Sequence, residues 1–406
     1  MPSRKRSNGE GSIFPYRNGF AAYVWVTKPD GKRTRKYVYG KTREIVHDKW
    51  IKLHQQAKAG PVATSVPTVG QFVTRWLAEV VKPNLAPLTY ATYETFSRLY
   101  IIPGLGAKRL DRLQLRDVQV WLNNIRDTCQ CCAQGKDAAR RSAKRRCCAV
   151  GQCCKDFVSG RTISDIRGAL RSALSRAITE DLISKNPAAD VKLPAARSRK
   201  RKAWSSDEAR RFLESARADD DPFYAAYVLV LVQGLRKGEA LGLTWDDVDL
   251  DQAEVTISWQ LQRVGGQLLH RETKTEGSDV TLPLPPICLA ALQLRRRQQQ
   301  EARSAAGNAW QASGLVFTTR YGTPIEPRNF SRSYDNRIDK AAVRRITVHD
   351  ARRTCGTLLA DLDVHPRVAM AILRHAQFSI TMEIYTQVSS KATRDALKRL
   401  GDSLDG

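Results

Sequence analysis

The chain has 406 residues and a formal net charge of +26, with 67 lysines and arginines against 41 acidic residues. This length favours two or three domains, and so strong a positive charge indicates a polyanionic partner. A membrane or exported protein is not expected, because the N-terminus lacks a signal-peptide core and no apolar run approaches the roughly 20 residues of a spanning helix. We therefore expect a cytoplasmic protein whose partner is nucleic acid.

Residues 1–62 predict a small basic β-sheet with one helix. Two alternating segments, 19–28 and 32–40, flank a Pro-Asp-Gly sequence at 29–31 that is typical of a hairpin turn. Thr42 can then serve as the N-cap of a helix. An Ala-, Gly-, Pro- and Ser-rich stretch without periodicity follows, which indicates a linker.

The next segment, 67–190, has the pattern of an all-α domain. In its clearest helix, 161–178, apolar residues recur every three or four positions, while the arginines fall largely elsewhere. Such a helix can pack one face in a core and turn the others toward phosphates. The apolar positions are Ile163, Ile166, Leu170, Leu174 and Ile178, and the arginines are Arg161, Arg167, Arg171 and Arg176.

A cysteine-rich insert at 129–154 interrupts this helical domain and holds seven of the nine cysteines. A disulfide scaffold is not expected in a chain without an export signal. One choice of cysteines gives C-x2-C, a 15-residue gap and C-x4-C, which is compatible with structural zinc. Other choices fit almost as well, and a set of free thiols in a basic loop stays open. The choice described is Cys129, Cys132, Cys148 and Cys153.

A basic linker, from Arg197 to Lys202, leads to a mixed segment at 203–406. The linker is either a solvated run of charge or a strap along a nucleic-acid backbone. Strands are expected at 253–264, 267–272 and 279–284 in one small sheet, with helices elsewhere. Gly265 and Gly266 are expected to form the turn that joins the first two strands. The fold class is therefore multidomain: a small N-terminal β-sheet with a helix, an all-α domain, and an α+β domain that is mainly helical with a small antiparallel sheet.

The sequence ITVHDARRTCG, at 346–356, predicts an anion site at the start of a helix. Thr347 and Asp350 have the spacing of a capping box, which places His349 in the first turn. Either Arg352 or Arg353 can share the face of His349, and spacing alone does not choose between them. A helix N-terminus already favours an anion, so phosphate binding and a surface salt-bridge cluster are both open.

Three further segments carry candidate functional residues. Arg236 follows an apolar helix and has Glu239 three residues on, a carboxylate that can orient its guanidinium toward a phosphate. Lys274 lies in the expected turn between the second and third strands. His375 is followed ten residues later by Tyr385.

This set resembles the tyrosine recombinase family, the phage-type and integrative-element site-specific integrases. The Gly-Leu-Arg-x-x-Glu box is matched by Gly234, Leu235, Arg236 and Glu239, and the His-x-x-Arg box by His349 and Arg352, which decides against Arg353. Leu373, His375 and Tyr385 match the last box, and Lys274 matches the family's hairpin lysine. The resemblance covers roughly residues 204–406.

The resemblance implies a site-specific DNA recombinase that integrates or excises a mobile element. Tyr385 would be the nucleophile and form a 3′-phosphotyrosyl intermediate, with Arg236 and Arg352 on the phosphate. His349 would assist proton transfer, His375 would bond the phosphate and Lys274 would protonate the leaving oxygen. Because the intermediate keeps the phosphodiester energy, neither ATP, metal nor another cofactor is expected in catalysis.

The implied domains are an arm-type DNA-binding domain at 1–62, a core-binding domain at 67–190 and a catalytic domain at 203–406. The implied partners are double-stranded attachment sites, further copies in a homotetramer, and an excisionase or a host DNA-bending protein. The protein would be associated with the nucleoid when bound. The C-terminal helix would dock either on its own subunit or on a neighbour.

Some residues depart from the family pattern. Arg353 stands where a second histidine is common, Arg374 replaces the usual glycine before His375, and Asp279 follows Ser278 where an arginine is frequent. The first two would add positive charge near the phosphate, whereas Asp279 weakens the assignment of Lys274.

Other tyrosines and histidines are interpreted as structural or minor. Tyr321 and Tyr334 follow no histidine at the required spacing, His365 is expected at a helix start, and His270 lies in a strand as a possible DNA contact. Two other functions stay open: a type IB-like nicking-closing topoisomerase, and a DNA-binding regulator without catalytic activity.

Overall fold

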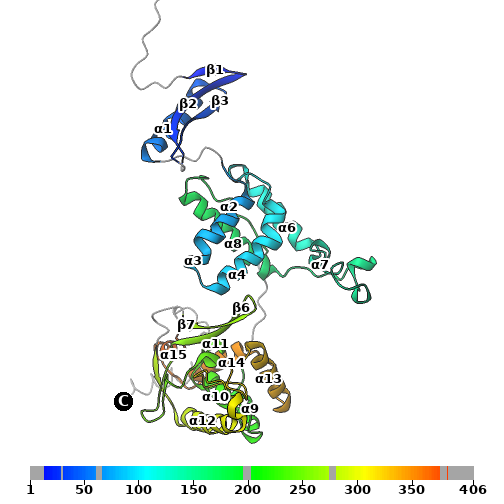
Figure 1. The fold of residues 1–406 in the computed structure, drawn as a ribbon, viewed down its shortest axis with the longest axis vertical. Helices are drawn as coiled ribbons and strands as arrows, with labels where there is room; N and C mark the ends of the chain where they lie inside the picture. The colour runs from blue at the N-terminus through cyan, green and yellow to red at the C-terminus, as the bar shows by residue number, and fades with distance from the viewer. Residues whose placement is uncertain are drawn as a thin grey trace, which may run out of the picture. The chain divides into compact units, whose positions relative to one another are not determined.

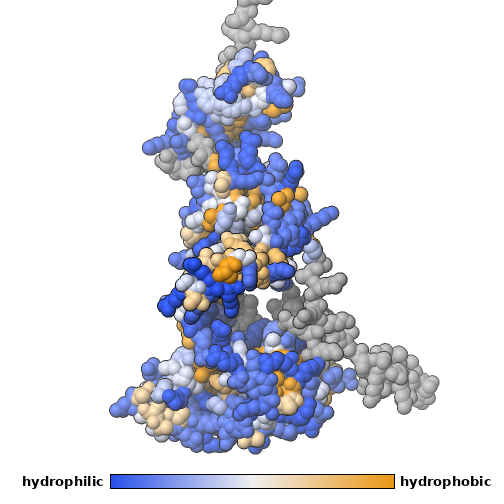
Figure 2. Space-filling view, turned by 90° about the vertical axis from the view of Figure 1, so that its right-hand side faces the viewer, coloured by the Kyte–Doolittle hydropathy of each residue, from blue (hydrophilic) through white to orange (hydrophobic). Residues whose placement is uncertain are grey.

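The computed structural model describes residues 13–28, 31–60, 66–194, 203–273, 280–374 and 382 (Figure 1). The chain divides into two compact units, Met1–Arg197 and Ser198–Gly406. Within the described ranges, no helix is both long and apolar enough to cross a membrane. Figure 2 shows that hydrophilic residues cover most of the visible face of the described parts.

The first unit begins with a three-stranded antiparallel sheet in the order β1-β2-β3. The strands are β1 (Phe14–Tyr16), β2 (Gly19–Thr27) and β3 (Arg33–Gly40), and helix α1 (Arg43–Ala59) follows. Val24 and Val26 face Leu53 of the helix in a small core. The predicted N-cap is confirmed, because Thr42 Oγ1 accepts a hydrogen bond from the Ile45 amide at 3.4 Å.

The other face of this sheet carries aromatic and basic side chains. Trp25, Tyr37 and Tyr39 are exposed. Arg35 lies directly opposite Trp25 in the register of β2 and β3, and its guanidinium carbon is 4.8 Å from the centre of the Trp25 ring. Cations prefer this position over an indole face. An exposed surface of this composition is suited to nucleic acid.

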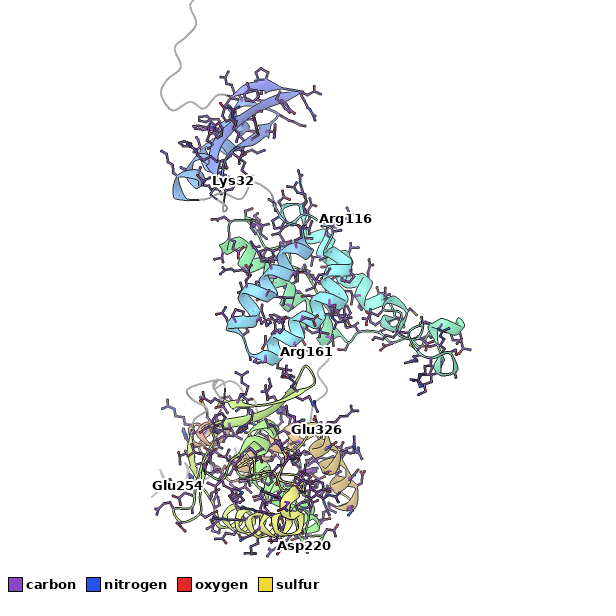
Figure 3. All side chains as sticks on the ribbon, in the orientation of Figure 1. Lys32, Arg116, Arg161, Asp220, Glu254 and Glu326 are labelled. Atoms are coloured by element: carbon purple, nitrogen blue, oxygen red, sulfur yellow. The ribbon has the colours of Figure 1, made fainter. Side chains whose placement is uncertain are left out.

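A second core holds the helical part of this unit. Helix α8 buries Ile163, Ile166, Leu170 and Leu174 as the periodicity predicted, with Ile178 half-buried. Arg116 and Arg161 on the same domain are exposed (Figure 3). The elements are α2 (Val69–Trp76), η1 (Leu77–Val81), α3 (Lys82–Asn84), α4 (Pro87–Phe96), η2 (Ser97–Ile101), α5 (Ile102–Leu105), η3 (Leu110–Arg112), α6 (Leu115–Asp127) and α8 (Gly160–Thr179).

The cysteine-rich insert leaves the helices after α6 and returns just before α8 (Figure 1). It contains only short elements: α7 (Gln130–Ala133), η4 (Ser142–Lys144) and η5 (Cys148–Val150). Its two ends are held together, because the Gln130 amide donates to the Asp156 carbonyl at 2.8 Å. The insert is therefore a long loop whose two ends are hydrogen-bonded to each other where it leaves and rejoins the helices.

The second unit has the largest hydrophobic core. Helix α10 (Tyr224–Val232) lies in its middle and is buried over nearly its whole length, which explains its uniformly apolar sequence. The other helical elements are α9 (Ser206–Ala218), α11 (Lys237–Gly242), α12 (Pro286–Ala306), η7 (Gly307–Ala309), α13 (Pro327–Lys340), α14 (Val348–Asp361) and α15 (Pro366–Leu373).

The described strands of this unit form two small sheets rather than the single sheet expected from the sequence. The predicted strand at 253–264 is split: β5 (Glu254–Thr256) pairs with β4 (Val248–Asp249) and β8 (Thr281–Pro283). Its second part, β6 (Trp259–Val264), pairs only with β7 (Gln267–Glu272) among the described strands. The hairpin turn is as predicted, since Gly265 and Gly266 both have positive φ.

Candidate active site

Helix α14 begins with the predicted capping box. Thr347 Oγ1 accepts from the Asp350 amide at 3.2 Å, and Asp350 Oδ2 accepts from the Thr347 amide at 3.2 Å. The Thr347 hydroxyl also donates to the same carboxylate oxygen at 2.7 Å. These bonds satisfy amides that a helix start would leave without partners, and so they fix where the first turn lies.

Arg352 follows directly after the first turn of α14, and its side chain extends into the protein. Its guanidinium donates to the carbonyl of Gly234 and to the carbonyl of Leu373, and the residue is 4% exposed. Burial lowers the pKa of Arg352 to about 9, and the nearby positive charge of Arg236 acts in the same direction. The side chain therefore remains charged at neutral pH and joins α14, the α10–α11 turn and the end of α15.

The α10–α11 turn presents Arg236. Gly234 has φ of +61°, and a Cβ there would lie 2.6 Å from a methyl carbon of Leu373, so both conformation and space require glycine. Leu235 is fully buried and anchors the turn. Arg236 follows as the N-cap of α11, with 43% of its side chain exposed.

Glu239 holds Arg236 in place, as the spacing in the sequence predicted. Its Oε2 accepts from the Arg236 amide at 2.8 Å, and its Oε1 accepts from Arg236 Nη1 at 2.5 Å. The same carboxylate lies 2.8 Å from Arg374 Nη2 and 4.0 Å from Arg352 Nη1. Burial on its own would raise the pKa of Glu239, but Arg374 and Arg236 outweigh it and hold that pKa below its usual range.

Arg374 adds its positive charge beside Arg236 and Arg352 from inside the protein and does not present it to the outside. Its side chain is fully buried and donates to Glu239 and, at 3.4 Å, to the Gly234 carbonyl. The backbone of Arg374 caps α15 in the left-handed region, with φ 51° and ψ 49°. This conformation explains why the family commonly has glycine here.

These four side chains form a compact cluster with one carboxylate and three guanidinium groups: Arg236, Glu239, Arg352 and Arg374. The cluster has a net charge of +2, counted from these groups. It lies beside the N-terminal turn of α14, where the helix dipole is also positive. Of the three arginines, Arg236 has the most exposed side chain, at 43% against 5% for Arg352 and 0% for Arg374. The cluster can therefore offer a rigid cationic surface to an anion.

The remaining predicted site residues have different positions. His349 is exposed on the first turn of α14, and Arg353 is half-buried on the same helix. Lys274, His375 and Tyr385 lie outside the described residues, as do Ser278 and Asp279. The structure thus brings Arg236 and Arg352 together through Glu239 and Gly234, with His349 on the same helix as Arg352.

Several residues interpreted as structural have such roles. Tyr334 is buried, and burial raises its pKa far above the usual range. His365 is the N-cap of α15 and accepts from the Arg367 amide at 3.3 Å, as predicted. His270 stacks on Trp259 and lies 2.8 Å from the Gly242 carbonyl, so it connects β7 to the end of α11. Tyr321 is partly exposed, at 43%.

Sequence reasoning missed the contribution of Trp204 to the site. Its amide donates to Thr354 Oγ1 at 3.1 Å, and its indole N–H donates to the Arg344 carbonyl at 2.6 Å. The first contact holds α14, and the second holds the loop before α14, against the start of the second unit. The sequence does show a tryptophan shortly after the basic linker. Its neighbours in the sequence do not indicate its hydrogen-bond partners, which lie 140 and 150 positions away.

Two family models and several known proteins match this chain. The model of the Phage integrase family matches residues 203–392, and that of the phage integrase N-terminal SAM-like domain matches residues 68–125. A tyrosine recombinase XerC-like protein of Caldanaerobacter subterraneus subsp. tengcongensis is 26% identical, over 92% of this chain and 93% of its own. An integrase of Streptomyces ambofaciens is 27% identical, over 94% of this chain and 93% of its own.

Among solved structures, the Tn1549 transposon integrase in complex with a circular intermediate DNA has the same fold. Its TM-score is 0.63 at 20% identity, and the match covers 82% of this chain and 99% of the other. The fold and the matched relatives define a site-specific recombinase, an enzyme that breaks and rejoins DNA strands. Residues 203–392 match the phage integrase family, and the chain is a tyrosine recombinase.

Proposed function

We propose that this recombinase integrates and excises a mobile element by cleaving DNA through a covalent phosphotyrosyl intermediate. The observation that carries the proposal is the Arg236–Glu239–Arg352 arrangement at the start of α14. Two guanidinium groups held by one buried carboxylate and by backbone carbonyls are preorganised, and they need no rearrangement when an anion arrives.

The proposed roles follow from the chemistry of a phosphodiester. Arg236 and Arg352 bind its non-bridging oxygens and stabilise the additional charge of the pentacoordinate transition state. Losing one donor of this kind typically costs about 3 to 4 kcal/mol. His349 assists proton transfer at the nucleophile from the exposed side of the helix.

Tyr385, His375 and Lys274 complete the proposed site. Tyrosine has a pKa near 10 in water, so only about one phenol in a thousand is ionised at pH 7, a handicap of about 4 kcal/mol. A cationic phosphate site offsets this handicap. The Tyr385 oxygen attacks phosphorus, its proton leaves toward His349, and the 5′ oxygen departs with a proton from Lys274. His375 donates to the phosphate. A 5′-hydroxyl then reverses these steps, so catalysis consumes no ATP.

We also propose three domains with the boundaries 1–62, 67–190 and 203–406. Three separate hydrophobic cores support this division, of which the second extends slightly beyond its range, to Val66 and Leu193. The family matches to residues 68–125 and 203–392 also support it. The first domain would bind arm-type DNA sites through the exposed Trp25 and Arg35 face, and the second would bind the core site.

The proposed substrate is a pair of double-stranded attachment sites. A net charge of +26 supports strong, salt-dependent binding to DNA. On paired sites the protein would act as a homotetramer, with an excisionase or a DNA-bending protein setting the direction. Because chromosome and element DNA are its substrates, it would act in the cytoplasm at the nucleoid.

The test is a nicked suicide substrate carrying the attachment site, incubated without Mg²⁺ or ATP. We expect a covalent protein–DNA adduct from the wild type and none from Tyr385→Phe, with equal binding to the site in a mobility-shift assay. An adduct that persists in this variant would place the nucleophile elsewhere. Binding without any adduct would favour a regulator, and relaxation of supercoils without strand exchange would favour a topoisomerase.

A further inference from the structure

The seven cysteines of the insert are gathered into two adjoining groups. The Sγ atoms of the first group all lie within 4.8 Å of one another, and the same holds for the second. The first group comprises Cys131, Cys147, Cys148 and Cys154, and the second comprises Cys129, Cys132 and Cys153. Residues from both ends of the insert meet in each group, so the grouping comes from the fold and not from sequence neighbours alone.

Distances within the groups suit tetrahedral zinc. A Zn–S bond of about 2.3 Å places two thiolates of a tetrahedron about 3.8 Å apart. Cys131 and Cys147 are separated by 3.5 Å, and Cys132 and Cys153 by 3.9 Å. The first group thus supplies the four ligands of a closed structural site, whereas the second supplies three.

Two short contacts join the groups. Cys148 Sγ of the first lies 2.7 Å from Cys132 Sγ of the second, and Cys154 lies 3.9 Å from Cys129. Two tetrahedral ions need eight ligand positions, and seven thiolates fill them if one thiolate binds both ions. Cys148 is the thiol best placed for this, because it makes the shorter contact between the groups.

We propose that residues 129–154 fold around two Zn²⁺ ions that share the thiolate of Cys148. Cys131, Cys147 and Cys154 complete one site, and Cys129, Cys132 and Cys153 complete the other. The second set, with Cys148, is the C-x2-C and C-x4-C combination noted in the sequence. On binding, the seven thiols release their protons to solvent, and no oxidation takes place.

Apart from its cysteines, the insert has few apolar contacts that could stabilise its fold. Its hydrophobic cluster consists of Cys129, Cys131 and Cys147, with Cys148 packed against it. A segment this short normally needs a metal or cross-links to fold. Metal coordination would therefore supply the stability that apolar packing supplies elsewhere in the chain.

Groups around the cysteines are arranged as zinc sites require. The Asp156 amide donates to Cys129 Sγ at 3.3 Å, and the Lys155 amide donates to Cys153 Sγ at 3.4 Å, which are bonds that favour thiolates. Asp137 is fully buried and accepts from the amides of Cys147 and Ala149 at 2.9 and 3.0 Å. It fixes the loop that carries Cys147 and Cys148.

Nearby basic residues also offset the negative charge of the proposed sites. Two Zn²⁺ ions with seven thiolates leave a net charge of −3. The stretch between Cys132 and Cys147 carries six basic residues. Arg140 is tied to this core through Asp137, at 2.7 Å. The six residues are Lys136, Arg140, Arg141, Lys144, Arg145 and Arg146.

The first experiment measures zinc in the full chain, purified without added metal, by native mass spectrometry and elemental analysis. We expect two zinc ions per chain and nine free thiols after denaturation in chelator. One zinc per chain would overturn the shared-thiolate arrangement. No zinc, together with seven free thiols, would overturn the whole proposal in favour of a disulfide, with Cys132 and Cys148 as the closest pair.

Variants then test the sharing. Cys131→Ser and Cys153→Ser each remove a ligand from one site only, so each should retain one zinc against a competing chelator. Cys148→Ser removes a ligand from both and should retain none. Cys288→Ala, in the other unit, is the control and should keep two. Full retention in Cys148→Ser, or complete loss in both single-site variants, would contradict a bridge at Cys148.

Discussion

The guanidinium of Arg374 lies 2.8 Å from the carboxylate of Glu239, although 135 positions separate the two residues in the chain. Both are buried, and Glu239 also holds Arg236. One carboxylate therefore fixes the end of α15 and orients the most exposed arginine of the cluster. The geometry of the proposed phosphate site depends on an ion pair that does not itself reach the phosphate.

Replacing Glu239 should cost more stability than replacing Arg374. Glu239→Gln leaves three buried or half-buried guanidinium groups without an anion, and removing one partner of a buried pair typically costs about 3 to 5 kcal/mol. Arg374→Met leaves Glu239 paired with Arg236, so we expect about half that loss. Hydrogen exchange of the α14 and α11 amides measures both. A larger loss in Arg374→Met would show that Arg374, not Glu239, organises the cluster.

The left-handed backbone at Arg374 allows a separate test. Arg374→Gly and Arg374→Ala remove the same ion pair, but only alanine keeps a Cβ at φ 51°. We expect the glycine variant to be the more stable by about 1 kcal/mol. Thermal unfolding of the two variants, compared directly, gives the difference. Equal stability would mean that the turn changes its conformation once the side chain is lost.

The lowered pKa of Glu239 predicts a specific pH dependence. A carboxyl group whose pKa is lower in the folded state stabilises the fold above its unfolded pKa, and loses that contribution as the pH falls through the folded pKa. The stability difference between wild type and Glu239→Gln should thus stay constant near neutral pH and decrease below the ordinary value of 4.5. Hydrogen exchange of α11 at a series of pH values measures it. A difference that grows in acid would contradict the assignment.

Arg352→Lys should reduce DNA cleavage by about 10² to 10³-fold, since an ammonium group cannot reproduce a planar guanidinium held by two carbonyls. Arg353→Lys, one position further along α14, is the matched control and should reduce cleavage much less. Single-turnover adduct formation on the suicide substrate gives both rates, and a mobility-shift assay verifies equal DNA binding. Equal losses in the two variants would speak against Arg352 as the phosphate ligand.

Local sequence patterns were sufficient to predict the helix starts at Thr42 and Thr347, the Gly265–Gly266 turn and the buried face of α8. Each depends on neighbours within a few positions. The break between β5 and β6 was not predictable in this way, because β5 pairs with β8 while β6 pairs with β7. The same holds for the pairing of Arg374: the sequence predicted only an added positive charge near the phosphate, whereas the partner of Arg374, Glu239, comes from a distant helix.

The bond between the Gln130 amide and the Asp156 carbonyl brings the two ends of the cysteine-rich insert to one point. A segment whose two ends lie together can be inserted or deleted without moving the helices that flank it, because only a short turn is then needed between α6 and α8. The hydrophobic core of the helical domain contains no residue of the insert, so its packing does not depend on the presence of residues 129–154.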